Sequence, residues 1–190
     1  MELRKRCIDQ ALLMLSEEGL KFKMSDLAKS LGISKKTVYT VFESKEELLL
    51  AVADDCFGEI KASEKKILED KSQPLLERIR RLIIVMPEQY TSLNWYRMEE
   101  VAKKYPLVYS HVQDCMENDW EPTIQLLEEG IASGVLKDFS LPVFKSMVEG
   151  CMEHFLTSPE LSSRGISYIQ ALEEMMNILL MGIAGEAVQK

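Results

Sequence analysis

Apolar residues recur along this chain with the spacing of helices, and no segment shows the apolar–polar alternation of a half-buried strand. Near the N-terminus, Ile8, Ala11, Leu12 and Leu15 share one face of a predicted amphipathic helix. Residues 44–68 predict a single long helix, because their apolar residues lie along one side. The pattern therefore indicates an all-α protein.

Prolines mark the boundaries of the helices that follow. Pro74 stands where a helix begins, and that helix is predicted to end at about residue 85 or 86. A short helix starts near Asn94 and ends before Pro106, and a longer one over 107–130 contains Pro122, which predicts a kink. With two C-terminal helices, the total is about nine.

Residues 23–48 predict a helix, a tight turn and a second short helix, followed by the start of the long one. Leu27, Ala28 and Leu31 form the apolar face of the first helix. Gly32 supplies the residue that can take positive φ at the helix end, and Ser34 is a good N-cap for the next helix. This arrangement is a helix-turn-helix, which places its second helix in the major groove of DNA.

The second helix has one apolar side and one polar side. Val38 and Phe42 are four residues apart and point into the same core. Lys35 and Lys36 lie in the first turn, where the helix dipole disfavours cations, so they suit a helix that faces phosphates. Ser44 and Glu47 have the spacing of a capping box that opens the long helix.

The sequence from Gly32 to Phe42, GISKKTVYTVF, followed by SKEEL from Ser44, resembles the signature of the TetR family of bacterial transcription regulators. The resemblance implies a three-helix DNA-binding domain over 1–46 and a helical domain for effector binding and dimerisation over 47–190. Four residues depart from the usual pattern on or near the DNA face, so no operator sequence is carried over: Lys23, Lys36, Thr40 and Val41.

Charge agrees with DNA as the partner. Residues 21–45 contain six lysines and two carboxylates, a net charge of +4, in a chain whose net charge is −8. A local basic face on an acidic protein suits a selective DNA binder better than a general nucleic-acid coat. The residues expected at base edges are Lys36, Thr37, Tyr39 and Thr40, and those expected at phosphates are Lys23, Lys35 and Lys45.

The last two predicted helices carry apolar residues at alternating spacings of three and four, as in helices packed at shallow angles. The TetR resemblance implies that two such helices from each subunit form the interface of a homodimer. The alternative is that these residues only close the core of the monomer. The predicted interface residues are Phe144, Val148, Cys151, Phe155, Ile169, Leu172, Met176, Leu179 and Ile183.

Aromatic residues and methionines are frequent over residues 60–155, which suits an adaptable cavity for a small-molecule effector. The alternative is ordinary core packing. A glutamate such as Glu99 or Glu100 inside the cavity would favour a cationic ligand. The predicted effector-binding residues are Trp95, Tyr96, Glu99, His111 and Trp120.

The four cysteines are scattered and contain no CxxC motif, which indicates reduced thiols. His111 with Cys115, and Cys151 with His154, could in principle join as a zinc site, but their spacing fits no known finger. We therefore predict neither a metal site nor a cofactor.

These features predict a DNA-binding regulator, most simply a dimeric repressor that an effector releases from a palindromic operator. The two recognition helices should lie about 34–36 Å apart. The chain shows no catalytic motif, no signal peptide and no transmembrane segment, so we expect a cytoplasmic non-enzyme with no membrane partner. The alternative function is a helical protein-interaction module without specific DNA binding.

Overall fold

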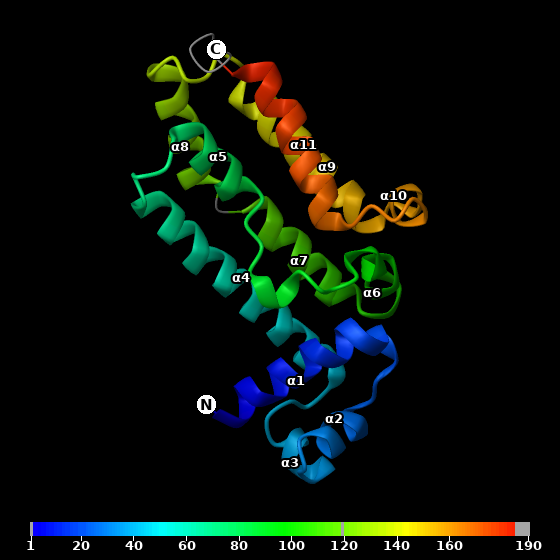
Figure 1. The fold of residues 1–190 in the computed structure, drawn as a ribbon. Helices are drawn as coiled ribbons and strands as arrows, with labels where there is room; N and C mark the ends of the chain where they lie inside the picture. Colours follow the sequence, from blue (N-terminus) through cyan, green and yellow to red (C-terminus); the bar gives the residue numbers. More distant parts are fainter. Residues whose placement is uncertain (1, 119, 185–190) are drawn as a thin grey trace.

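The computed structural model describes residues 2–118 and 120–184, apart from the side chain of Tyr96. Within these residues the chain forms eleven α-helices, three 3-10 turns and no strand, which confirms the all-α prediction (Figure 1). The helices are α1 (Glu2–Glu18), α2 (Met24–Ser30), α3 (Lys35–Tyr39), α4 (Lys45–Glu69), α5 (Leu75–Ile83), α6 (Met98–Lys104), α7 (Pro106–Glu117), α8 (Glu121–Ala132), α9 (Leu141–Thr157), α10 (Pro159–Ser163) and α11 (Tyr168–Ile183). The 3-10 turns are Gly19–Lys21, Glu88–Tyr90 and Trp95–Arg97.

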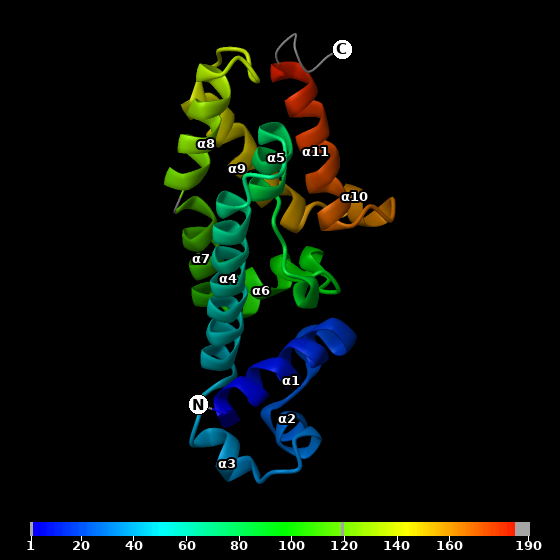
Figure 2. The same cartoon turned by 60° about the vertical axis from the view of Figure 1, so that its left-hand side comes forward.

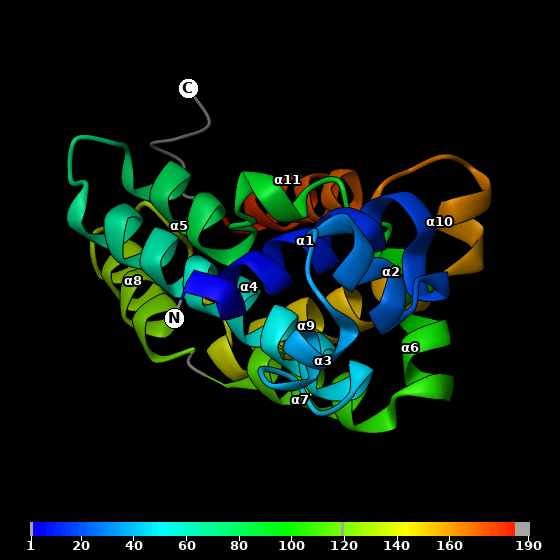
Figure 3. The same cartoon turned by 90° about the horizontal axis from the view of Figure 1, so that it is seen from below.

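Helices α1, α2 and α3 form a small head at one end of the molecule, together with the first turns of α4 (Figures 1 and 3). Leu48 of α4 is buried in the same core as these helices, so the long helix is anchored inside the head. The fully buried side chains of the head core are Cys7, Ala11, Leu27, Val38, Phe42, Leu48 and, from the segment before α6, Tyr90.

Helix α4 runs from the head along the rest of the molecule (Figure 2). Its 25 residues correspond to a length of about 37 Å. At its start, the Ser44 hydroxyl accepts a hydrogen bond from the N–H of Glu47 at 3.0 Å, as predicted. The Glu47 carboxylate accepts from the N–H of Glu43 at 2.6 Å, so the returning bond of the predicted capping box comes from the preceding residue.

A buried arginine provides hydrogen-bond donors for backbone carbonyls at the C-terminal end of α4. The Arg78 side chain donates hydrogen bonds to the carbonyls of Ile67 and Leu68, at 3.3 and 2.7 Å. These carbonyls lie in the last turn of α4, where the helix dipole favours a cation. Arg78 therefore attaches α5 to the end of α4.

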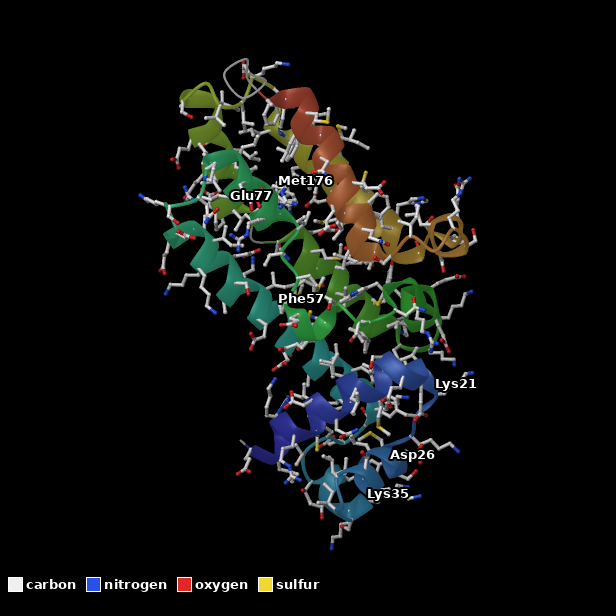
Figure 4. All side chains as sticks on the ribbon, viewed as in Figure 1. Lys21, Asp26, Lys35, Phe57, Glu77 and Met176 are labelled. Carbon is white, nitrogen blue, oxygen red and sulfur yellow. The ribbon has the colours of Figure 1, made fainter. Side chains whose placement is uncertain are left out.

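The remaining helices form the body, which has its own core. Met176, labelled in Figure 4, is fully buried on α11, which packs on α9 and α5. Helices α9 and α11 lie side by side along one edge of the body (Figures 1 and 2). No helix in the described part of the chain is long and apolar enough to cross a bilayer.

Two predicted helix boundaries were wrong. The helix expected over 107–130 is divided, because α7 ends at Glu117 and Pro122 lies in the first turn of α8. Proline lacks an N–H, so it fits the start of a helix better than its interior. Helix α5 ends at Ile83, earlier than expected, and Pro87 disfavours the helical conformation of the residue before it.

Candidate DNA-binding surface, ligand cavities and exposed apolar face

Local hydrogen bonds fix the turn between α2 and α3. Gly32 has φ +66°, which glycine adopts without strain. The N–H of Ile33 donates to the carbonyl of Ala28 at 3.0 Å, which closes the turn. The Ser34 hydroxyl accepts from the N–H of Thr37 at 3.0 Å, so Ser34 caps α3 as predicted.

Helix α3 presents a polar face to solvent. Val38 and Phe42 are fully buried beneath it, which fixes the rotation of the helix. Figure 4 shows Lys35 on the side of the head that faces away from the body. The exposed predicted DNA-binding residues of this segment are Lys35, Lys36, Tyr39 and Thr40, and Thr37 is half-buried.

Two of the predicted base contacts already have partners in the free protein. The hydroxyls of Ser34 and Thr37 lie 2.8 Å apart, and the Thr40 hydroxyl donates to the carbonyl of Thr37 at 2.6 Å. Tyr39 is 40 % exposed, and the Lys35 ammonium lies 5.6 Å from the centre of its ring. The Tyr39 ring is therefore held beside a cation on the exposed face.

Lys23 and Lys45 occupy different environments. Lys23 is exposed at the start of α2, and its backbone N–H donates to the Asp26 carboxylate at 2.8 Å. The Lys45 ammonium donates to the carbonyls of Leu20 and Phe22, at 2.8 and 2.6 Å, and burial lowers its pKa. Lys45 is thus turned into the protein, which disagrees with its predicted phosphate contact.

A cavity of about 110 Å³ lies within the body, and we call it the body cavity. Trp95 and Trp120, two of the predicted effector-binding residues, line it. Several of the methionines from which we predicted an effector region also line the body cavity. Other lining side chains are Ile60, Met86, Met116, Met152 and Tyr168.

The other predicted effector residues lie elsewhere. Glu99 pairs with Lys103 at 2.6 Å on the exposed side of α6. His111 Nε2 lies 2.7 Å from a carboxylate oxygen of Asp54. Neither Glu99 nor His111 lines a cavity described above, and the side chain of Tyr96 lies outside the described part of the structure. The rotation of α6 and α7 places both residues away from the body cavity, so these two predictions are corrected.

A second cavity, of about 100 Å³, lies where the head meets the body, and we call it the junction cavity. Leu15 and Leu20 of the head line one side of it, and α4, α6 and α7 line the others. Cys56, Phe57 and Trp95 line both cavities, so the two spaces adjoin. Figure 4 labels Phe57 midway along α4.

Four of the nine predicted interface residues point inward. Phe144, Val148, Leu172 and Met176 are buried in the core of the body, so they cannot form a surface between subunits. The apolar spacing was correct, but it marked the side of each helix that packs within the monomer. The other five are half-buried: Cys151, Phe155, Ile169, Leu179 and Ile183.

The same two helices nevertheless expose a different apolar face. Val143 and Met147 of α9 are exposed, and each directly precedes a buried residue. Ile178 and Met181 of α11 are 71 % and 76 % exposed. Such a concentration of exposed apolar side chains marks an interaction surface.

The cysteines and histidines do not gather into a metal site in the described residues, which contain no group of three or more potential ligands. Cys115 Sγ lies 3.8 Å from His111 Nε2. Burial raises the pKa of the Cys115 thiol, which disfavours the thiolate that binds metals.

Residues 8–52 match the model of the tetR family of bacterial regulatory proteins. The matched segment contains the turn at Gly32, the cap at Ser34 and the exposed face of α3 described above. This segment belongs to the TetR family of DNA-binding domains. Its members are DNA-binding transcriptional regulators, which confirms the predicted resemblance and the broad function.

Relatives of the protein are similar to it over nearly their whole length. An uncharacterized helix-turn-helix transcriptional regulator of Bacillus subtilis, YvaF, is 25 % identical over 182 residues, covering 96 % of each chain. A transcriptional regulator of Saccharomonospora viridis, solved with choline, has TM-score 0.74 and 19 % identity, covering 97 % of this chain and 99 % of the other. FadR of Bacillus subtilis, solved with stearoyl-CoA, has TM-score 0.65 and 19 % identity, covering 94 % and 98 %.

Sequence analysis missed the residues that join the head to the body. Arg97, from the turn before α6, donates a hydrogen bond to the carbonyl of Glu18 in α1 at 3.1 Å. Asp55 of α4 accepts a hydrogen bond from Lys5 of α1 and another from Tyr90. No spacing pattern could have found these contacts, because each joins residues more than thirty positions apart.

Proposed function

We propose that this protein is a dimeric transcriptional repressor, released from a palindromic operator by a small-molecule effector. The observation that carries the proposal is the exposed basic face of α3, held by the Ser34 cap and the buried Val38. Residues 1–46 act as the DNA-binding domain, and residues 47–190 bind the effector and dimerise. Helix α4 connects these two parts.

On DNA, α3 enters the major groove. Lys36 and Tyr39 approach base edges directly, whereas Thr37 and Thr40 exchange their present hydroxyl partners for bases. Each good base contact contributes about 1–3 kcal/mol of discrimination. Lys23 and Lys35 contact phosphates, which carry affinity more than specificity.

Dimerisation uses the exposed apolar face of α9 and α11. Val143, Met147, Ile178 and Met181 supply its centre. A two-fold axis through this face gives two heads that read the two halves of a palindrome. The residues buried beneath it, such as Val148, keep the helices in position.

The effector enters the body cavity beside Trp95 and Trp120. Two proteins of similar fold were solved with different ligands, stearoyl-CoA and choline. The fold alone therefore does not identify the ligand of this chain. The cation preference expected from Glu99 has no support, because that carboxylate pairs with Lys103 outside the cavity. The aromatic and methionine lining favours a mainly apolar ligand.

Fluorescence anisotropy with DNA from upstream of the protein's own gene tests the proposal, with random DNA for comparison. We expect selective binding that weakens steeply as salt rises. A Lys36→Ala/Tyr39→Ala double variant should lose selectivity, whereas Lys65→Ala, an exposed lysine on α4, should not. If selection from a random DNA pool also yields no preferred sequence, a protein-interaction module becomes the better explanation.

A further inference from the structure

The junction cavity is unusual because the DNA-binding head supplies part of its wall. Leu15 and Leu20 line it together with Val52 and Ala53 of α4, and Val101 and Val108 are among its other apolar lining residues. A molecule in this space would contact the head directly, without an intervening layer of protein.

One charged side chain, Arg97, lines this largely apolar space. Arg97 lies against the end of α1, where Gly19 has φ +65°. A Cβ atom at position 19 would lie 1.5 Å from Arg97 Nη1, so the guanidinium packs closely over the glycine backbone. Arg97 Nη1 donates to the neutral carbonyl of Glu18 at 3.1 Å.

No carboxylate in the described residues forms an ion pair with Arg97. Glu100 is close enough for Arg97 to contribute to the lowering of its pKa. The Glu100 carboxylate, however, pairs with Lys104 at 2.7 Å, which compensates its charge. The guanidinium therefore lies beside an apolar cavity with a carbonyl as its partner, where a carboxylate would bind it more strongly.

We propose that the junction cavity binds an apolar carboxylate, with its hydrocarbon tail inside and its carboxylate on Arg97. The size of the space limits the tail. About 100 Å³ is available, and each water-sized group needs roughly 10–15 Å³. A chain of about seven to ten non-hydrogen atoms, such as that of octanoate, fills it.

This ligand competes with the head for Arg97. When the carboxylate takes the guanidinium, the Glu18 carbonyl loses its donor and the end of α1 loses one of its attachments to the body. The head then has more freedom to change position, and a ligand that favours such a state weakens DNA binding by its differential affinity. This last step rests on the proposed function, whereas binding at Arg97 does not.

Calorimetric titration of the wild-type protein with octanoate, 1-octanol and octyltrimethylammonium tests the head-group chemistry. The three probes share one tail, so differences between them report the site at Arg97. We expect octanoate to bind at least tenfold more tightly than 1-octanol, and the cation most weakly. Equal binding of octanoate and 1-octanol would overturn the proposal without requiring any variant.

Three variants test the location. Arg97→Gln should remove the preference for octanoate over 1-octanol, and Ala53→Phe, which fills the junction cavity, should abolish binding of both. Ile60→Phe is the matched control, because Ile60 lines only the body cavity. Thermal unfolding verifies that each variant is folded. Loss of octanoate binding in Ile60→Phe but not in Ala53→Phe would place the ligand in the body cavity and overturn the proposal.

Anisotropy with the selected DNA separates this inference from the proposed function. Saturating octanoate should lower DNA affinity by about 5–150-fold, the usual range of coupling between sites. Octanoate binding through Arg97 with unchanged DNA affinity would support the site and overturn the coupling. If the protein binds no DNA at all, the proposed function fails, and the titrations above still decide the site.

Discussion

The hydroxyl of Tyr90 donates a hydrogen bond to Oδ2 of Asp55 at 2.5 Å, and the same carboxylate accepts from the Lys5 ammonium at 2.8 Å. These residues come from the segment before α6, from α4 and from α1, so one carboxylate joins the head, the long helix and the body. The indole N–H of Trp95 donates to the carbonyl of Tyr90 at 3.2 Å. Trp95 lines both cavities, so its hydrogen bond to Tyr90 connects this side chain to the Asp55 carboxylate.

Tyr90→Phe should lower the free energy of unfolding by about 1–2 kcal/mol, because a partly buried hydrogen bond to a charged acceptor is lost. Chemical denaturation measures this change. Tyr109→Phe is the control, since its hydroxyl has no hydrogen-bond partner among the described residues. Equal losses in the two variants would show that the Asp55 contact contributes nothing specific.

Lys45 and Lys36 should differ in what their removal changes. Lys45→Met removes the ammonium that donates to Leu20 and Phe22, and we expect it to destabilise the protein by about 1–2 kcal/mol. Lys36→Met should leave stability unchanged and weaken selective DNA binding. Denaturation and a salt titration of DNA affinity separate the two effects. If Lys45→Met instead reduced the salt dependence of DNA affinity and left stability unchanged, the phosphate contact predicted from the sequence would be correct.

The head was largely predictable because its signals are local. Gly32 and Ser34 act through hydrogen bonds to residues three or four positions away in the chain, and Val38 and Phe42 are only four residues apart. Such patterns determine the conformation of a segment without reference to the rest of the fold. The capped start of α4 at Ser44 follows the same rule.

The sites in the body were less predictable, since they depend on the rotation of each helix. Leu172 and Ile178 lie on one amphipathic helix, yet the first is buried in the monomer and the second is exposed. Sequence spacing marks an apolar stripe without saying which protein surface covers it. For the same reason, Glu99 and His111 were wrongly predicted to line the effector cavity. Arg97 was missed because its hydrogen-bond partner, Glu18, is far away in the sequence.

Stability should fall at alkaline pH through Cys56. Burial raises the pKa of this thiol from 9.0 to about 12. The folded state therefore keeps its proton at pH values where the unfolded chain has lost it. The resulting stabilisation is complete below about pH 9 and is lost as pH rises toward 12, by up to about 1.4 kcal/mol per pH unit.

Denaturation of the wild type and of Cys56→Ala at several pH values between 8 and 10 measures this contribution. The difference in unfolding free energy between the two proteins should shrink as pH rises, because only the wild type has the buried thiol. Other ionisable groups are common to both proteins and cancel in the difference. A difference that stays constant across this range would mean that Cys56 titrates alike in the folded and unfolded states.

The exposed face of α9 and α11 should control the oligomeric state. Ile178→Glu places a carboxylate on a side chain that is 71 % exposed in the single chain, so the monomer should remain folded. In the proposed dimer the same carboxylate would be buried without a partner, at a cost of several kcal/mol or more. Light scattering coupled to size-exclusion chromatography should then detect a monomer that no longer binds palindromic DNA.

Leu107→Glu is the matched control for this variant. Leu107 is 64 % exposed, close to the value for Ile178, but it lies at the start of α7 and not on either helix of the proposed interface. The control should remain dimeric and bind DNA as the wild type does, because the change in hydrophobicity and charge is the same and only the position differs. A dimer in Ile178→Glu would show that the interface lies elsewhere, and a monomer in Leu107→Glu would point to α7.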